Sequence, residues 1–286
     1  MTIKNPVEWT YDQARIGLRA AGAAGRSFAR PPAAFDGARP LVRRLSFADL
    51  RDCLALGFQD FRSYRTDLLF IGIVYPLAGL LLARVMLGYD MLPLVFPLVA
   101  GFALIGPLAA TGLYEMSRRR EQGGQVTWID AFEAFRSPAI GEIVKFGVAL
   151  LGVFLLWMIA AALIYGATLG WQAPETPSAF LAAVLTTPAG WALIVIGGAV
   201  GFGFALMALA IGVVTVPLLL DRNVDASTAI STSIAVMRGN PGPILAWGAL
   251  VATLLAAGAV PLLLGLIVVM PVLGHATWHL YRRAVW

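Results

Sequence analysis

Two histidines near the end of the chain are the residues whose type and spacing could do chemistry. His275 and His279 are the only histidines and stand four residues apart, so on a helix they lie on one face. Two imidazoles at this spacing can share a metal ion, although a third ligand would have to come from another helix. A haem would need a further imidazole on an opposing helix. We favour the simpler interpretation, in which both histidines bond to backbone or neighbouring helices and the chain holds no cofactor.

Other kinds of chemistry find no support in the sequence. The chain contains no phosphate-binding loop motif, no HExxH motif and no GxSxG motif, and two histidines alone leave little for acid–base catalysis. The loop acids Asp130, Glu133 and Glu142 stand beside basic residues, which predicts solvated faces. We therefore predict that the protein is not an enzyme.

The elements that must position the histidines follow from the composition. Of 286 residues, 59% are hydrophobic and 13% are charged, about half the charged fraction of a soluble domain. Glu175 is the only charged residue between Phe146 and Leu220, and no Asp, Glu, Lys or Arg occurs from Ile244 to Leu280. These uncharged runs exceed the roughly 20 residues that cross a bilayer. The sequence therefore predicts a polytopic, all-α membrane protein.

The hydrophobic stretches predict six transmembrane helices. The run from 244 to 280 is too long for one span, and Pro261 divides it because proline interrupts the helical hydrogen bonds. The run from 189 to 220 is also long, and one tilted or broken helix is favoured there over a hairpin of two. The predicted spans are about 68–86, 92–114, 146–166, 189–220, 244–260 and 262–280.

The distribution of basic residues predicts the orientation. With six spans, every Lys and Arg except Arg84 lies on the side of the two termini, as expected for cytoplasmic segments. The net charge of +5 is explained in this way, and no basic stripe interleaved with aromatic residues indicates nucleic-acid binding. We expect a multi-pass protein of the bacterial cytoplasmic (inner) membrane, with both termini in the cytoplasm.

A threefold pattern divides the membrane domain, predicted at residues 46–284, into amphipathic-helix-plus-hairpin units. A basic, partly disordered cytoplasmic tail (residues 1–45) precedes it. Each unit begins with a short amphipathic helix that ends near an arginine, and the first two carry a capping-box pattern at Ser46 and Thr127. Such helices lie in the membrane interface. The predicted interface anchors are Arg62, Arg136, Arg238, Trp128, Trp278 and Tyr281.

One glycine pair could mediate helix packing. Gly197 and Gly201 form a GxxxG pattern in the fourth predicted span, which permits close contact between helices. We expect packing within the bundle more than a dimer face. The single cysteine, Cys53, excludes an intrachain disulfide.

Two segments carry a family resemblance. Residues 39–51 (RPLVRRLSFADLR) and the closing residues 271–283 (PVLGHATWHLYRR) resemble a family of uncharacterised bacterial integral membrane proteins, a domain of unknown function. The resemblance implies a six-span fold of unknown activity. Residues 216–222, continuing to Arg238, are similar to the membrane region of some bacterial glycerophosphodiester phosphodiesterases. That likeness implies architecture without catalysis.

These observations predict an accessory, scaffold or assembly protein that acts through helix packing and lipid contact. Its expected partners are membrane lipids and other membrane proteins, a respiratory complex among them. Two alternatives remain open. Prolines within the spans are compatible with a transporter or lipid-handling protein for a neutral or amphiphilic substrate. The histidine pair is compatible with a metal- or haem-binding respiratory subunit.

Overall fold

The fold is all-helical throughout the part of the chain that the structure describes. A bridge between Val42 and Val285 is the only strand-like pairing in that part, so the predicted all-α class is confirmed. The predicted first span at 68–86, most of the tail and Trp128 lie outside the described residues. The computed structural model describes residues 35, 40–63, 93–104, 106–124, 126, 131, 134–172, 174–260 and 264–286.

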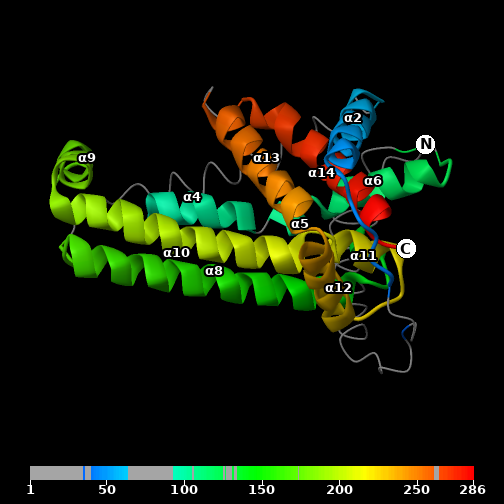
Figure 1. Cartoon of the computed structure of the whole chain (residues 1–286), viewed down its shortest axis with the longest axis horizontal. Coiled ribbons are helices and arrows are strands. Elements are labelled where there is room, and N and C mark those ends of the chain that lie inside the picture. Colours follow the sequence, from blue (N-terminus) through cyan, green and yellow to red (C-terminus); the bar gives the residue numbers. More distant parts are fainter. Residues whose placement is uncertain are drawn as a thin grey trace, which may run out of the picture.

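Two long apolar helices run side by side along the molecule (Figure 1). They are α8 (Ile140–Thr168) and α10 (Pro188–Gly212), and the shorter α4 (Val95–Leu104) packs against both. At 1.5 Å per residue, the 29 residues of α8 reach about 43 Å, which exceeds the roughly 30 Å hydrocarbon core of a bilayer. Each helix is therefore long enough to cross a membrane.

Three helices in the described part are long and apolar enough to be membrane spans. They are α8, the run Pro188–Asp221 and α13 (Pro241–Ala259). Only 17% of the most apolar window of α8, and the same share of α13, is buried inside the protein. Exposed apolar surface of this extent is unfavourable in water, whereas lipid accepts it. The structure thus supports a helical membrane protein with at least these three candidate spans.

The loop between α8 and α10 contains a helix that we did not predict. α9 (Pro177–Thr186) lies across the end of the long helices (Figure 1). The hydroxyl of Thr176 accepts the Ala179 N–H, and the hydroxyl of Thr187 accepts the Gly190 N–H at the start of α10. Both threonines are followed by a proline. The hydroxyl caps the helix, and the proline at the first helical position has no N–H that needs a partner. This pattern could have revealed α9.

The fourth predicted span is one broken helix, as favoured, and contains no hairpin. α10 is continuous to Gly212, and after a turn at Val213 and Val214 the chain resumes as α11 (Thr215–Asp221). Pro217 explains the break, because it has no N–H to donate to the carbonyl of residue 213 and its ring would clash there.

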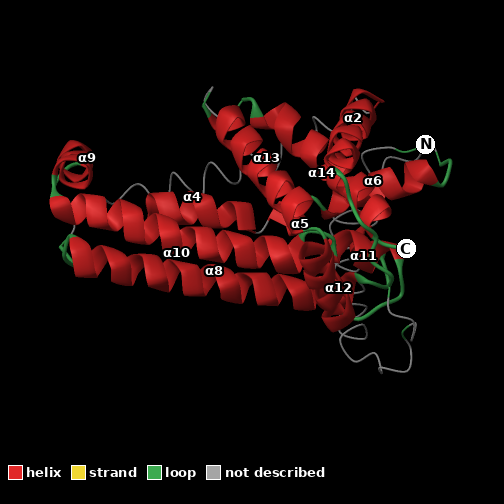
Figure 2. Cartoon of the chain, viewed as in Figure 1, coloured by secondary structure: helices red, strands yellow, loops and turns green. Residues whose placement is uncertain are grey.

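Three helices complete the C-terminal half (Figure 2). The carboxylate of Asp225 caps α12 (Ala226–Gly239), α13 follows, and α14 (Leu266–Ala284) closes the chain. The last uncharged run is divided as predicted, because α13 ends at Ala259 and α14 begins at Leu266, although Pro261 itself lies outside the described residues. α14 is not one of the three candidate spans, and its second half is largely buried in protein.

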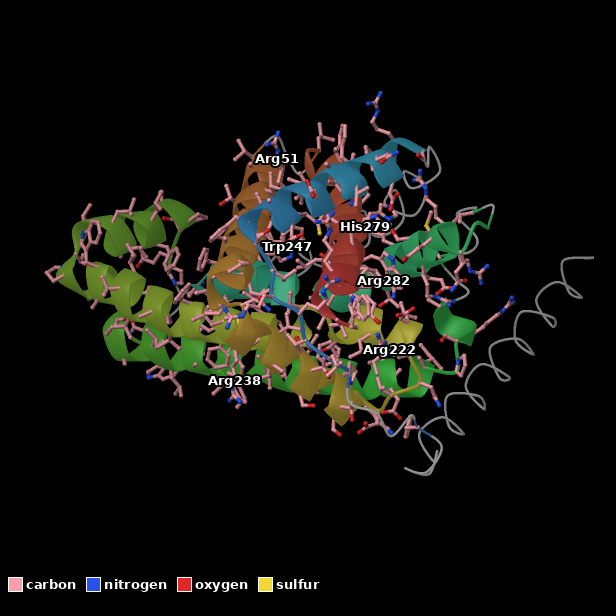
Figure 3. All side chains as sticks on the ribbon, turned by 45° about the vertical axis from the view of Figure 1, so that its right-hand side comes forward. Arg51, Arg222, Arg238, Trp247, His279 and Arg282 are labelled. Carbon is pink, nitrogen blue, oxygen red and sulfur yellow. The ribbon has the colours of Figure 1, made fainter. Side chains whose placement is uncertain are left out.

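The first amphipathic helix forms where the sequence predicted it. α2 (Phe47–Ser63) begins with a capping box in which Asp49 accepts the Ser46 N–H at 2.8 Å and the Ser46 hydroxyl accepts the Asp49 N–H at 3.2 Å. Figure 1 looks almost along α2 while α8 and α10 lie in the plane of the picture, and Figure 3 shows α2 over its length. α2 is therefore transverse to the long helices.

The second predicted span is divided among three helices. α4 is followed by α5 (Gly106–Ala109) and α6 (Thr111–Glu121), and α6 carries the chain beyond the predicted boundary at residue 114. The main core lies where α6 meets α2, α11 and α14, and it contains fully buried side chains such as Leu218 and Leu280. We call this end of the molecule, opposite α9, the α14 end.

The segment before α2 is tied to the end of the chain. The backbone of Leu41 exchanges two hydrogen bonds with that of Trp286, at 2.8 and 2.9 Å, and Arg43 N–H donates to Ala284. The side chain of Asn240, between α12 and α13, accepts the Leu45 N–H at 2.6 Å and donates to the Arg43 carbonyl at 2.9 Å. These bonds fix the start of α2 at the α14 end.

Candidate functional site

The C-terminal half of α14 carries a series of polar side chains, most of which face protein. α14 contacts α2, α6, α11 and α13, so its buried polar groups must find partners inside the molecule or lose hydrogen bonds at a cost of about 1–3 kcal/mol each. We call these side chains the polar spine. Its members are His275, Trp278, His279, Tyr281, Arg282 and Arg283.

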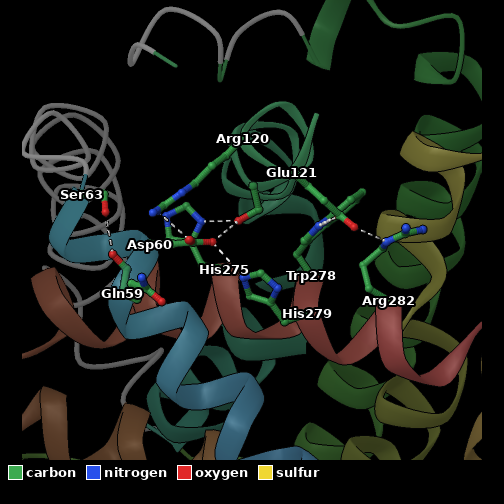
Figure 4. Close-up of polar contacts among 10 residues, drawn as sticks. Gln59, Asp60, Ser63, Arg120, Glu121, His275, Trp278, His279 and Arg282 are labelled. Atoms are coloured by element: carbon green, nitrogen blue, oxygen red, sulfur yellow. Dashed lines mark hydrogen bonds and ion pairs between the residues drawn. The ribbon is translucent and has the colours of Figure 1, made fainter. Parts of the chain in front are cut away.

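Both histidines are linked to one buried carboxylate, Asp60 of α2, His279 directly and His275 through Ser117 (Figure 4). The Nε2 atom of His279 lies 2.9 Å from Oδ2 of Asp60. The hydroxyl of Ser117 in α6 donates to the same oxygen at 3.1 Å and lies 2.7 Å from Nδ1 of His275. Nη1 of Arg120 donates to Oδ1 of Asp60 at 2.7 Å. Residues from α6 and α14 therefore converge on one side chain of α2.

The proton positions follow from the donors and acceptors. An ionised carboxylate only accepts, so His279 must donate to Asp60 from Nε2. Because the single proton of Ser117 goes to Asp60, His275 must donate to the Ser117 oxygen from Nδ1. The chain of donation from His275 through Ser117 to Asp60 is complete without solvent, and His275 is fully buried.

The surroundings of Asp60 favour its charged form. Burial raises the pKa of Asp60, but the hydrogen bond from His279 and the electrostatic influence of His275, His279 and Arg120 outweigh burial, and the pKa lies below its ordinary value of 3.8. Asp60 is thus an anion at neutral pH, and its charge is matched by Arg120, whose side chain is only partly exposed.

The next residues of the spine bind two further acids. The indole N–H of Trp278 donates to Glu121 at 3.0 Å, and the Tyr281 hydroxyl donates to Asp221 at 2.6 Å. Arg282 joins both carboxylates, through Nε to Glu121 at 2.9 Å and through Nη1 to Asp221 at 3.2 Å. α14 is thereby linked to the end of α6 and the end of α11.

The last residue of the spine returns to α2. Nη1 of Arg283 contacts Asp49 at 2.6 Å and Asp52 at 3.1 Å. Beneath this contact, Cys53 is fully buried. Burial raises the pKa of the Cys53 thiol to about 12, which keeps it protonated and unreactive at neutral pH.

Two other buried carboxylates take part in polar contacts at the α14 end. Glu115 accepts from Arg118 and Arg119, each at 2.8 Å. Glu142 contacts Lys145 at 2.6 Å and accepts the N–H of Ala226 at 2.9 Å. Only 3% of Glu142 is exposed, so its predicted place on a solvated face is wrong: it joins the start of α8 to the start of α12.

The spine was only partly visible in the sequence. The histidine pair was identified, but Asp60 and Ser117 were not. Asp60 follows Leu50, Cys53 and Gly57 at steps of three, four and three residues, so it stands on the inward face of α2. A carboxylate on the inward face of an amphipathic helix was the sequence signal that could have revealed Asp60.

The described part of the polar spine does not form a metal centre on its own. Within the described residues, no group of three or more His, Cys, Asp or Glu side chains is arranged to hold a metal ion. The ring nitrogens His275 Nδ1 and His279 Nε2 are engaged with Ser117 and Asp60. Metal or haem binding by the pair stays a prediction.

The predicted interface anchors fall into two groups. Arg62, Arg136 and Arg238 are exposed and lie at the ends of α2, η3 (Ala134–Arg136) and α12 respectively, and their role as interface anchors stays a prediction. Trp278 and Tyr281 are almost completely buried and bonded to carboxylates. The structure corrects these two: their rings pack within the protein because α14 is enclosed on several sides.

The predicted glycine pair has one member in a close contact. A Cβ at Gly201 would lie 2.8 Å from the ring of Trp157 in α8, so this glycine admits the tryptophan between α8 and α10. Gly197 has no neighbour of this kind, since a Cβ there would meet only Leu193 of its own helix. The close contact at Gly201 therefore lies within the protein, between α8 and α10.

A cavity of about 230 Å³ also opens at the α14 end, between the start of α8 and the end of α11. Its charged lining is mixed, with Arg118 and Arg222 beside Glu142 and Asp221. A lining of mixed charge favours neither an anionic nor a cationic ligand.

Comparison with known proteins identifies the class of this chain. Residues 95–221 match the family described as predicted integral membrane protein (DUF2189), which confirms the resemblance to an uncharacterised integral membrane family. The match covers α4 to α11, including both long apolar helices, and lies outside the two segments on which the resemblance was based. No curated protein and no solved structure matches the chain. The chain is therefore similar to an integral membrane protein family whose function is unknown.

Proposed function

We propose that the protein is a non-enzymatic accessory or assembly protein of the bacterial cytoplasmic membrane, with six spans and both termini in the cytoplasm. In this role the membrane helices present a fixed apolar surface to a membrane-protein partner. The α14 end holds those helices in one arrangement from the cytoplasmic side.

The polar spine is the observation that carries this proposal. Five of its six side chains bond to acids that belong to or end three other helices, namely Asp49, Asp52, Asp60, Glu121 and Asp221, and the sixth, His275, contacts Ser117 of α6. Charge-assisted hydrogen bonds are roughly twice as strong as neutral ones, and each spine contact is made between parts of the chain far apart in sequence. Polar groups arranged in this way fasten helices together.

The apolar surface of α8 and α10 supplies the surface for a partner. Ile159 of α8 is 57% exposed and Phe202 of α10 is 63% exposed. Between them the two helices contain no charged side chain from Phe146 to Gly212 except in the connecting loop. Such a surface can pack against lipid or against the helices of another protein.

The orientation is supported by the position of the basic residues. Arg118, Arg119 and Arg120 end α6, and Arg282 and Arg283 end α14, so all of them gather at the α14 end. Basic residues concentrate on the cytoplasmic side of membrane proteins.

Photo-crosslinking in the native membrane tests the proposal. A photo-reactive amino acid is placed at Ile159 or Phe202, with the fully buried Leu150 as the matched control, and adducts are identified by mass spectrometry. The proposal expects one discrete protein adduct from the exposed positions and none from Leu150. Adducts with lipid alone, together with a protein that purifies without any partner, would overturn it.

The same preparation separates the alternatives. A co-purifying amphiphilic molecule, with no protein partner, indicates a lipid-handling protein. Stoichiometric metal by elemental analysis, or a haem absorption band, indicates that His275 and His279 are ligands.

A further inference from the structure

The two faces of α2 have opposite character. Leu50, Cys53, Gly57 and Asp60 form its buried face, and a Cβ at Gly57 would lie 2.6 Å from Ala276 of α14, so this face is in close contact with protein. The opposite side is exposed at steps of four, four, three and four residues, which is one stripe of a helix. We call it the outer stripe of α2. Its residues are Phe47, Arg51, Ala55, Phe58 and Arg62.

The outer stripe combines aromatic rings with positive charge. Phe47 is 65% exposed and Phe58 is 46% exposed. The guanidinium of Arg62 lies over the Phe58 ring, 5.9 Å from its centroid. Within the described residues Arg51 has no carboxylate partner, and in Figure 3 it lies on the outer side of the helix.

The acids of α2 do not neutralise this stripe. Asp49 and Asp52 both contact Arg283, and Asp60 is bonded to Arg120 and His279. The remaining charges on the exposed side are basic, so the outer stripe is complementary to an anionic surface.

The stripe is continuous with a candidate membrane span. Phe47 stands next to the first turn of α13, because a Cβ at Gly242 would lie 3.7 Å from its ring. From there Leu245, 41% exposed, begins the outer surface of α13, which is one of the three candidate spans. Since α2 is also transverse to α8 and α10 (Figures 1 and 3), the stripe lies where a headgroup layer would meet the protein.

We propose that the outer stripe of α2 binds the headgroup region of an anionic phospholipid bilayer. Phe47 and Phe58 enter the boundary of the acyl chains, as on interfacial helices, and Arg51 and Arg62 pair with lipid phosphates. A protein partner on this stripe would be a different interaction and is an outcome of the test. The proposal does not depend on the assembly role, because it concerns the lipid around the protein and requires no second protein.

The test places a fluorophore on the stripe in the full-length protein. Ala55→Cys is labelled with a maleimide dye, and the native Cys53 can stay because it is buried and protonated. The protein is reconstituted in mixed phosphatidylcholine–phosphatidylglycerol nanodiscs in which either the choline lipid or the glycerol lipid is brominated near its headgroup. Gln122→Cys, on the exposed turn after α6, is the matched control.

The proposal expects quenching at position 55 and little at position 122. It also expects stronger quenching by brominated phosphatidylglycerol than by phosphatidylcholine, with a ratio that falls about fivefold for each arginine removed in Arg51→Gln and Arg62→Gln. Arg51→Lys and Arg62→Lys should preserve the ratio.

No quenching at position 55 by either lipid would overturn membrane contact, as would protection of that position by a co-purifying protein. Equal quenching by both lipids, unchanged in the glutamine variants, would overturn the preference for anionic lipid.

Discussion

At the scale of single residues, Asp60 is a buried charge that depends on several hydrogen-bond partners. It takes hydrogen bonds from three other helical positions, Ser117, Arg120 and His279, and only 8% of its side chain is exposed. A buried charge is tolerated only when it is paired and fully hydrogen bonded. Asp60 meets this condition through contacts that the rest of the fold must hold in place.

Removing the charge of Asp60 should therefore weaken the whole α14 end. Asp60→Asn keeps the shape but leaves Arg120 without its anion, and we expect a loss of about 2–4 kcal/mol in stability. Thermal unfolding in detergent measures the change. Asp52→Asn is the control, because its side chain is 58% exposed and an exposed pair contributes about 0–1 kcal/mol. Equal melting temperatures for the two variants would contradict the role given to Asp60.

The lowered pKa of Asp60 predicts a particular acid sensitivity. A carboxyl whose pKa is lower in the folded protein stabilises it at pH values above the unfolded pKa, near 3.8, and this contribution is lost as the pH falls through the folded pKa. The melting temperature of the wild-type protein should thus fall more steeply below about pH 4 than that of Asp60→Asn. Parallel curves for the two proteins would show that Asp60 does not titrate in this way.

The sequence revealed the histidines but not their partners. His275 and His279 stand out because no other histidine exists and their spacing places them on one face. Asp60 and Ser117 lie 215 and 158 residues before His275, and only the packing of α2, α6 and α14 brings them together. Because these residues are so far apart in the sequence, no local sequence pattern indicates that they are in contact.

At the scale of elements, the contact between α2 and α14 depends on one glycine. A Cβ at Gly57 would lie 2.6 Å from the Cβ and backbone N of Ala276 and from the carbonyl of Val272. Two of these three atoms belong to the backbone of α14, so the neighbour cannot move aside without shifting the helix.

Gly57→Ala should therefore separate α2 from α14 and destabilise the protein by about 1–3 kcal/mol. Thermal unfolding measures this loss, and trypsin cleavage after Arg51 should become faster as α2 loosens. Gly203→Ala on α10 is the matched control, because no atom lies within 4 Å of a Cβ built there and alanine favours helix over glycine. If both alanine variants unfold at the wild-type temperature, the close packing of α2 on α14 is not required.

Helix starts and stops could be predicted where a local signal exists. The Ser46 capping box and the proline that divides the last uncharged run each act within one or two turns. The environment of a helix cannot be predicted in the same way, because an apolar stretch looks alike whether it faces lipid or protein. For this reason α14 was expected to be a plain span, although half of it is enclosed by α2, α6 and α11.

At the scale of the whole molecule, the structure separates a lipid-compatible part from a polar part. α8 and α10 extend away from the α14 end (Figure 1). Their apolar side chains are exposed, and ionic contacts collect at the α14 end. Composition alone predicted this division, since long uncharged runs alternate with basic segments. The prediction of six spans goes further than this division. Within the described residues, three helices are long and apolar enough to cross a membrane.

The central claim is that α8 crosses the membrane with the α14 end in the cytoplasm. Gln122, after α6, and Glu175, between α8 and α9, are both exposed and lie on opposite sides of α8 along the chain. Gln122→Cys and Glu175→Cys can be probed with a membrane-impermeant maleimide, because the buried Cys53 does not react. In cells with a permeabilised outer membrane, the account predicts labelling of Glu175→Cys at once and of Gln122→Cys only after the inner membrane is opened. Labelling of both from the same side would contradict it.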